Sequence, residues 1–137
     1  MLHDTAGAVV AVVLVAIGLL HVLWGYSPWP AKSRDELARF VFSRPGMPSR
    51  SACLVVGIGL LAAAYALFAL IGVVPLIGPH WLYATGVWGL TVALLLRGFA
   101  GPLANRGAGR DFARWNLIAY SPLCAALGLC ALVAATA

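Results

Sequence analysis

Four long apolar stretches divide the chain, and shorter polar segments separate them. The stretches run from about residue 6 to 26, 51 to 74, 80 to 99 and 116 to 136, and none contains an aspartate or a glutamate. A helix needs about 20 apolar residues to cross the hydrocarbon core of a bilayer, which is close to the length of each stretch. The pattern therefore predicts an all-α fold, a four-helix transmembrane bundle, with residues 1–137 forming a single membrane domain.

A short amphipathic helix is expected in the loop between the first two spans. Ser33 followed by Glu36 is the pattern of a capping box, in which two side chains satisfy the free amides at a helix start. Leu37, Phe40 and Val41 then recur at the spacing of one helix face. A helix with an apolar face and basic flanks suits the headgroup layer, so we expect this one to be interfacial.

The basic residues gather in two regions of the chain. The first loop holds Lys32, Arg34, Arg39, Arg44 and Arg50, and the end of the third span with the third loop holds Arg97, Arg106, Arg110 and Arg114. Four spans put both regions on the same side of the membrane, and the positive-inside rule makes that side cytoplasmic. We therefore expect this loop helix on the cytoplasmic side and both termini on the non-cytoplasmic side. Trp24 and Trp115 lie near expected span ends, as in an aromatic belt.

The composition excludes a water-soluble domain. Hydrophobic residues make up 63% of the chain and charged residues only 9%, whereas soluble domains carry roughly 25% charged residues. A net charge of +5 suggests nucleic acid in a soluble protein. Here the positive-inside distribution already accounts for the charge, so nucleic acid is not expected as a partner.

His21 is the ionisable residue that lies well inside a span. It is about five residues, or roughly 7.5 Å, from the expected cytoplasmic end of the first helix. Ionisable residues within a membrane usually face other helices and mark functional sites. One stripe, at spacings of three and four, carries His21 with mostly small residues: Gly7, Ala11, Leu14, Gly18 and Gly25. Small residues let helices approach closely, so we expect the stripe to face the bundle.

The fourth span offers polar partners at a matching depth. Asn116 and Tyr120 are four residues apart on one face, and Ser121 follows. Pro122 removes a hydrogen bond from the carbonyl of Ile118 and is expected to disturb the helix there. We expect a cluster of His21, Asn116 and Tyr120, with Arg97 or Asp111 at its cytoplasmic edge and Trp24 about one turn from His21. Two interpretations stay open, hydrogen bonds that hold the bundle together or a ligand-binding or catalytic site.

The sequence indicates no metal site and no particular cofactor. Cys53, Cys124 and Cys130 form no CxxC pair, and we expect them to be free thiols that pack as small apolar side chains. His3 and His80 lie at the opposite membrane face from His21, too far for two histidines to bind one haem. Motifs of metalloproteases, serine hydrolases and phosphate-binding loops are missing from the sequence.

Two segments resemble a family of small bacterial integral membrane proteins of unknown function. The segment HVLWG, residues 21–25, resembles the H-x-x-W-x-x-G end of the family's first helix, and YSPLC, residues 120–124, resembles the Y-S-P-L-C of its last helix. The chain departs from the family after the tryptophan, at Tyr26, and at Asn116, where an acid is common. The resemblance implies a four-helix protein in a bacterial inner (plasma) membrane and marks recurring positions: His21, Trp24, Tyr120, Ser121 and Pro122.

Two functions follow from these features as hypotheses. The first is a non-catalytic accessory or assembly subunit of a membrane complex, because the spans are tightly connected and no catalytic motif is present. The alternative is a membrane-embedded enzyme or binding protein for a quinone, an isoprenoid or a lipid, which would reach His21 and Tyr120 from the cytoplasmic leaflet. The expected partners are the lipid bilayer and a membrane protein, a second copy of the chain or a lipophilic small molecule. A channel or transporter is less favoured, since the chain has no inverted repeat.

Overall fold

The computed structural model describes residues 1–136, which form helices and, within that range, no strand. Four helical segments are long and apolar enough to cross a membrane: Leu2–Trp24, Arg50–Leu70, His80–Asn105 and Arg110–Ala135. The first two are α1 and α3. The third consists of α4 (His80–Ala100) and the 3₁₀ helix η1 (Gly101–Asn105), and the fourth of α5 (Arg110–Trp115), the π-helix η2 (Asn116–Tyr120) and α6 (Ser121–Ala135). The predicted all-α, four-helix fold of a multi-pass membrane protein is confirmed.

The spans differ from the predicted ones mainly at their ends. α1 begins at Leu2 rather than near residue 6 and ends at Trp24, and α3 ends at Leu70 rather than near 74, because a turn with Gly72 at φ 77° follows it. The last helical segment begins at Arg110 rather than near 116. At the starts of α1 and of the last segment, polar residues continue the helix, and a count of apolar residues leaves them out.

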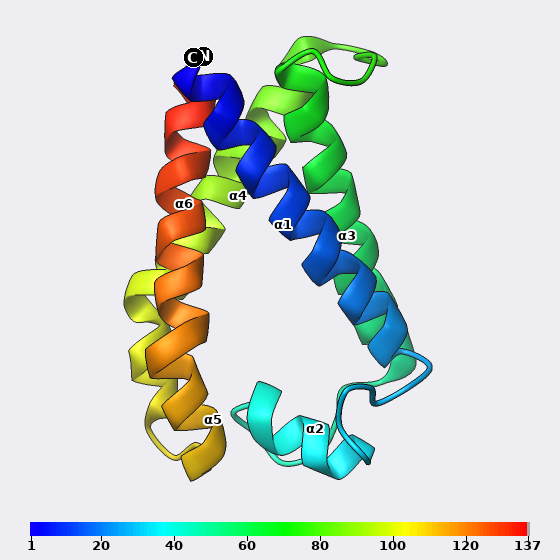
Figure 1. Cartoon of the computed structure of the whole chain (residues 1–137), viewed down its shortest axis with the longest axis vertical. Helices are drawn as coiled ribbons and strands as arrows, with labels where there is room; N and C mark the ends of the chain where they lie inside the picture. The colour runs from blue at the N-terminus through cyan, green and yellow to red at the C-terminus, as the bar shows by residue number, and fades with distance from the viewer. Residues whose placement is uncertain (137) are drawn as a thin grey trace.

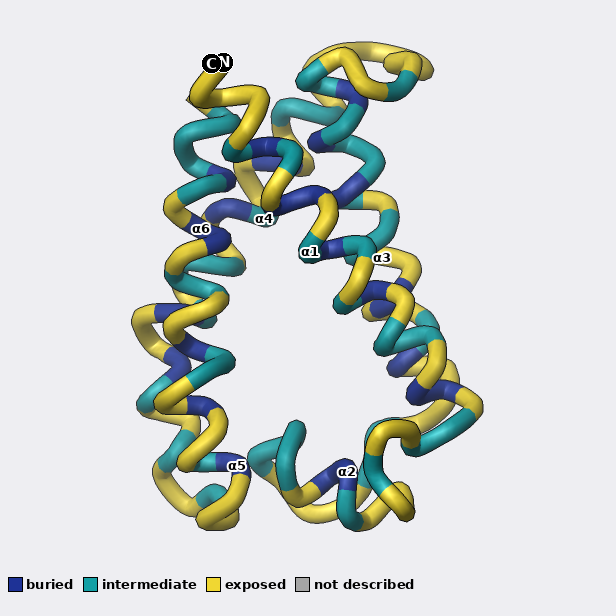
Figure 2. Tube along the Cα trace, viewed as in Figure 1, coloured by how far each residue is buried: buried dark blue, intermediate teal, exposed yellow. Residues whose placement is uncertain are grey.

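The spans form two tight pairs, α1 with α3 and α4 with α6. Figure 1 shows that the pairs meet near the chain termini, where α1 lies beside α6 and α3 beside α4, and diverge toward the other end. The buried core lies in the half where the pairs meet (Figure 2) and consists of Val10, Ala11, Leu14, Ala64, Leu67, Val87, Leu127 and Ala131. The diverging half therefore has no continuous core between the pairs.

Glycines set the spacing inside each pair. A Cβ atom added to Gly57 of α3 would lie 2.9 Å from the carbonyl oxygen of Gly18 in α1, so these two backbones are nearly in contact. In the other pair, a Cβ on Gly98 would collide with the backbone of Ala125. The predicted small-residue stripe of α1 does face other helices, since every member except His21 is buried, while His21 itself is half-buried.

The expected loop helix is α2 (Arg34–Val41), and it lies across the end where the pairs diverge (Figure 1). The Ser33 hydroxyl accepts a hydrogen bond from the Glu36 amide at 3.1 Å, as in the predicted capping box. The Glu36 carboxylate, however, accepts from the amide of Lys32 at 2.7 Å rather than from the Ser33 amide. Leu37 is buried against Trp24, so the apolar face of α2 contacts the protein's own helices.

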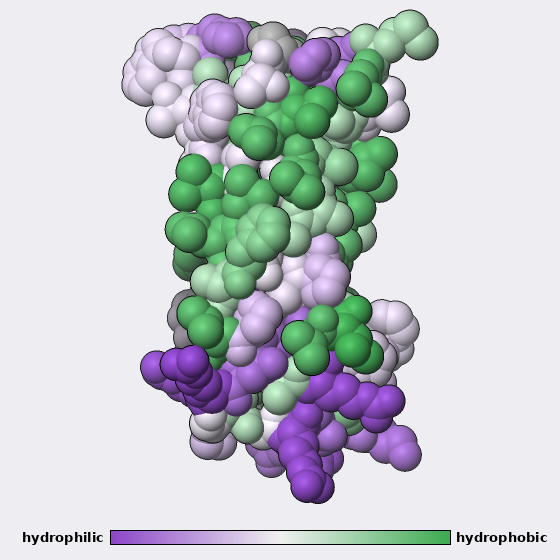
Figure 3. All heavy atoms as spheres, turned by 90° about the vertical axis from the view of Figure 1, so that its left-hand side faces the viewer, coloured by the Kyte–Doolittle hydropathy of each residue, from purple (hydrophilic) through white to green (hydrophobic). Residues whose placement is uncertain are grey.

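The surface agrees with a membrane location. Figure 3 shows a hydrophobic band between two more polar ends, of which the end with α2 and α5 is the more hydrophilic. Large apolar side chains are exposed along this band, including Val55, Ile58 and Leu96, each more than 60% exposed. Such side chains are stable in contact with lipid chains but not with water.

Candidate functional site

Three of the predicted candidate residues form one hydrogen-bonded network inside the α4–α6 pair. Asn116 is completely buried, and its side-chain oxygen Oδ1 accepts hydrogen bonds from Arg97 at 2.8 Å and from the Ser121 hydroxyl at 3.1 Å. Its side-chain nitrogen Nδ2 donates to the backbone carbonyl of Gly101 and to the side-chain oxygen of Asn105, both at 2.8 Å. Every polar atom of Asn116 is thus satisfied within the protein, which is the arrangement of a structural junction rather than of an open binding site.

A π-helical turn makes this junction possible. Asn116–Tyr120 is a π-helix in which the Ser121 backbone amide donates to the Asn116 backbone carbonyl, and it ends two residues before Pro122. The helix accommodates the proline by one wider turn. Residues five apart point to different sides of an α-helix, whereas here the side chains of Asn116 and Ser121 bond to each other and to Arg97.

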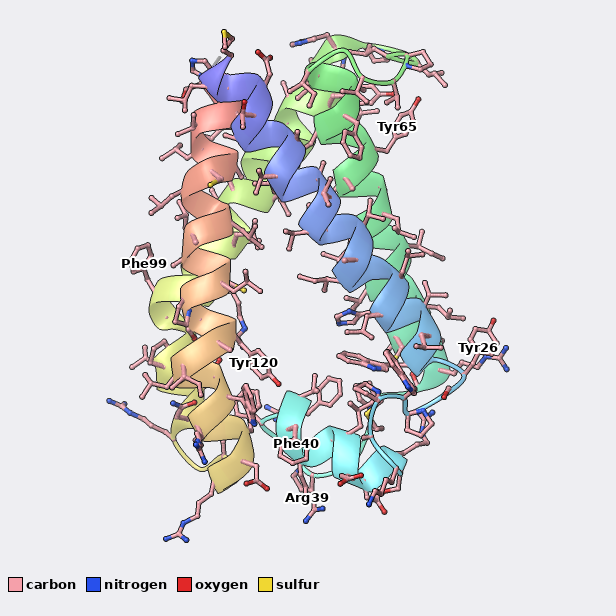
Figure 4. All side chains as sticks on the ribbon, in the orientation of Figure 1. Tyr26, Arg39, Phe40, Tyr65, Phe99 and Tyr120 are labelled. Carbon is pink, nitrogen blue, oxygen red and sulfur yellow. The ribbon has the colours of Figure 1, made fainter. Side chains whose placement is uncertain are left out.

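Tyr120 points away from this network and toward α2. Its hydroxyl donates a hydrogen bond of 3.0 Å to the carbonyl oxygen of Phe40, near the end of α2. Figure 4 shows the two side chains directed toward each other across the diverging end of the pairs. The Phe112 ring lies 6.3 Å from the Tyr120 ring on the other side. Tyr120 therefore connects the last helical segment to α2, a contact between residues 80 positions apart.

His21 lies beside Trp24 in α1, and no hydrogen bond joins it to Asn116 or Tyr120. Its Nδ1 is 2.9 Å from the backbone carbonyl oxygen of Ile17, and the centroids of the His21 and Trp24 rings are 5.0 Å apart. A carbonyl only accepts, so Nδ1 carries the proton of this bond. Nε2 has no hydrogen-bond partner in the part of the chain that the structure describes. In the neutral ring Nε2 is then a hydrogen-bond acceptor.

A cleft of about 550 Å³ lies between the diverging pairs and is bounded by α2. Leu20 and Trp24 of α1 line it on one side, and Ala119 and Tyr120 of η2 on the other. The remaining lining comes mostly from α2 and its neighbours: Leu37, Phe40, Val41, Trp115, Pro30, Ala31, Lys32 and Glu36. The cleft is therefore mainly apolar and aromatic, with one cation and one carboxylate among the lining side chains.

The structure brings together some candidates and separates others. Trp24 and Tyr120 line the same cleft from opposite pairs, and His21 lies next to Trp24, whereas Arg97, Asn116 and Ser121 lie in the separate network. Sequence reasoning missed two groups that line the cleft, the apolar face of α2 and Trp115. The sequence signals for both, the apolar spacing of α2 and a tryptophan near a span end, are also those of anchors at the membrane surface, so they do not point to a cleft.

Metal ligands do not converge at this cleft. Within residues 1–136, no group of three or more His, Cys, Asp or Glu side chains could hold a metal ion. The three cysteines are free thiols; Cys53 is buried and the other two are half-buried.

The comparisons with known proteins identify the family of the chain but assign it no reaction. Neither the curated proteins nor the solved structures include a match to the chain. Residues 14–131 match DUF3995, whose description is a protein of unknown function. The matched range includes α2, both walls of the cleft and the Arg97–Asn116 network, and the chain thus belongs to the DUF3995 family.

Proposed function

We propose that this protein binds a lipophilic molecule, a quinone, an isoprenoid or a lipid, in the cleft between its helix pairs. The carrying observation is the cleft itself, about 550 Å³ in volume and lined by aromatic and aliphatic side chains from both pairs and α2. Its volume falls within the range of roughly 300 to 1,000 Å³ that is typical of small-molecule sites. Four aromatic side chains, Trp24, Phe40, Trp115 and Tyr120, offer flat apolar surfaces to a ring or a chain.

The proposed site opens toward the cytoplasmic leaflet of a bacterial inner membrane, with both termini on the other side. The basic loops support this orientation, because Lys32, Arg39 and Arg110 all lie at or beside the α2 end. The ligand would enter from the membrane, between the diverging pairs.

His21 is the polar contact that we assign to the ligand. Its Nδ1–H bond to Ile17 holds the ring, and Nε2 remains to accept a hydrogen bond from a hydroxyl group. His21 adjoins the cleft through Trp24, a lining residue whose ring centroid is 5.0 Å from that of His21. These features support binding; they supply no acid–base pair for a reaction, since no carboxylate or second histidine bonds to His21 in the described chain.

The accessory-subunit hypothesis stays a prediction. It rests on the compact spans and the lack of a catalytic motif, and the cleft adds no support to it. The two hypotheses differ in one consequence. Only a binding protein retains a small molecule whose retention is lost when the cleft is filled.

Filling the cleft is the direct test. Ala119 lines the cleft and Ala126 is exposed on α6, so Ala119→Phe and Ala126→Phe make the same change in two environments. The full chain would be purified in mild detergent and measured by native mass spectrometry. We expect a small-molecule adduct on the wild type and on Ala126→Phe, and its loss from Ala119→Phe. Equal retention by both variants, or no adduct on the wild type, contradicts the proposal, and co-purification with larger chains instead favours the accessory role.

The role of His21 is tested with the same measurement. His21→Ala removes Nε2 and leaves Trp24 and the cleft walls in place, so we expect about tenfold weaker retention, the loss of one good hydrogen bond in a dry site. His3→Ala, at the other end of the molecule, is the matched control. Unchanged retention by His21→Ala contradicts the assignment of His21 but not the cleft.

A further inference from the structure

A second pocket lies on the opposite face of α2 from the cleft. It also measures about 550 Å³ and lies between the first loop and the start of α5. Asp35, Ala38, Arg39 and Phe42 line it at helical spacing, whereas Leu37, Phe40 and Val41 of the same segment line the cleft. α2 therefore separates the apolar cleft from a second pocket that several charged side chains line.

Three arginines from separate segments line this pocket: Arg39 of α2, Arg44 of the following turn and Arg110, the first residue of α5. None of them has a hydrogen-bond or ion-pair partner among the residues that the structure describes, where the one ion pair joins the N-terminal amine to Asp4. Two backbone turns complete the pocket, at Gly46 with φ 89° and Gly107 with φ 77°. A glycine at each turn leaves the pocket wall free of side chains there.

The charges in the pocket favour a phosphate group. A guanidinium presents a planar fork of donors that matches phosphate oxygens, and three exposed arginine side chains line one space here. Asp35 and Asp111 also line the pocket, which leaves a net charge of +1, and neither is paired with an arginine within residues 1–136. Carboxylates and guanidiniums held apart in this way suit a headgroup that carries both a phosphate and an ammonium.

We propose that this arginine pocket binds the phosphate group of a phospholipid headgroup at the cytoplasmic surface of the membrane. The site is independent of the ligand in the cleft, because it uses the other face of α2 and a different set of side chains. A soluble phosphate ester shares the same chemistry and is the alternative source of the group.

The test compares two variants with the same change in net charge. Arg39→Gln/Arg110→Gln removes two pocket arginines, and Arg106→Gln/Arg114→Gln removes two exposed arginines of the same region that do not line the pocket. The full chains in detergent would be mixed with dioleoyl phosphatidylethanolamine, or with dioleoylglycerol as the lipid without phosphate, and measured by native mass spectrometry. We expect the pocket variant to retain at least about tenfold less phospholipid than the wild type, from the loss of two charge-assisted contacts, while the control variant matches the wild type.

Each outcome decides the proposal. An equal loss in both variants shows a general effect of charge, and unchanged retention in the pocket variant shows that the arginines do not bind; either result overturns it, as does equal retention of dioleoylglycerol. Displacement of the phospholipid by glycerol 3-phosphate at micromolar concentration supports the phosphate site with a soluble source, and no displacement supports the lipid. Arg39→Lys/Arg110→Lys, which keeps both charges, should recover part of the binding and guards against a folding defect, as does a circular dichroism spectrum equal to that of the wild type.

Discussion

Asn116 should be the most costly single polar side chain to remove from the α4–α6 pair. Asn116→Leu keeps a similar side-chain shape, so it creates no large cavity, but it deletes the three hydrogen bonds from Asn116 to Arg97, Gly101 and Asn105 of the neighbouring segment. Interhelical hydrogen bonds in membrane proteins contribute about 0.6 kcal/mol each on average and at most about 1.7 kcal/mol. Three of them amount to about 2 kcal/mol at the average value and about 5 kcal/mol at the upper one.

We expect Asn116→Leu to lower the free energy of unfolding by about 2 to 4 kcal/mol, because Arg97 keeps one other partner, the Ser121 hydroxyl at 3.3 Å. Unfolding in mixed micelles with increasing sodium dodecyl sulfate, followed by the fluorescence of the five tryptophans, measures this quantity. Thr91→Val is the matched control, since Thr91 is 1% exposed but its hydroxyl bonds only within α4, to Val87 at 2.8 Å. The reasoning fails if Asn116→Leu costs no more than Thr91→Val.

Three further predictions follow from the fold. Gly57→Val should separate α1 from α3 and destabilise the protein by about 1 to 3 kcal/mol, whereas Gly59→Val, which has open space around it, should not; denaturation of the two variants compares them directly. Tyr120→Phe removes the bond to Phe40 and should raise hydrogen exchange of α2 amides with little change in overall stability, and protected α2 amides in this variant would contradict that role. A reporter fused after residue 137 should be active only outside the cytoplasm, and cytoplasmic activity would reverse the proposed orientation.

The sequence predicted the elements of this fold well because each has a local signal. Span number follows from hydropathy, α2 from the Ser33–Glu36 pattern and its apolar spacing, and the contact face of α1 from its small residues. The π-helix was not predicted as such, although Pro122 indicated a disturbance at the right place. A proline removes one hydrogen bond, but the neighbouring helix decides whether the chain bends or widens.

The candidate site could be predicted only in part, because depth in the membrane does not determine which side chains meet. His21, Asn116 and Tyr120 lie near the same end of their spans, yet each makes its contacts in a different direction. The π-turn places Asn116 toward Arg97, and Tyr120 is directed to α2. Neither direction follows from the spacing of four residues that suggested a shared face, since that spacing assumes a regular α-helix.

The position of the cleft follows from where the packing energy is concentrated. Close glycine contacts hold each pair together along its length, and the large buried side chains that join the pairs, such as Leu14, Leu67 and Leu127, lie in the half near the termini. At the other end, the Arg97–Asn116 network lies inside the α4–α6 pair and does not join the two pairs. The contacts that close the gap there are those of α2, with Leu37 and the Tyr120–Phe40 bond. In water such an apolar gap would be costly, but in a bilayer lipid chains fill it without loss, because lipid is as apolar as the cleft walls. The fold can therefore keep an open apolar cleft at this end, and a ligand with a better fit than a lipid chain needs to displace only that chain to bind.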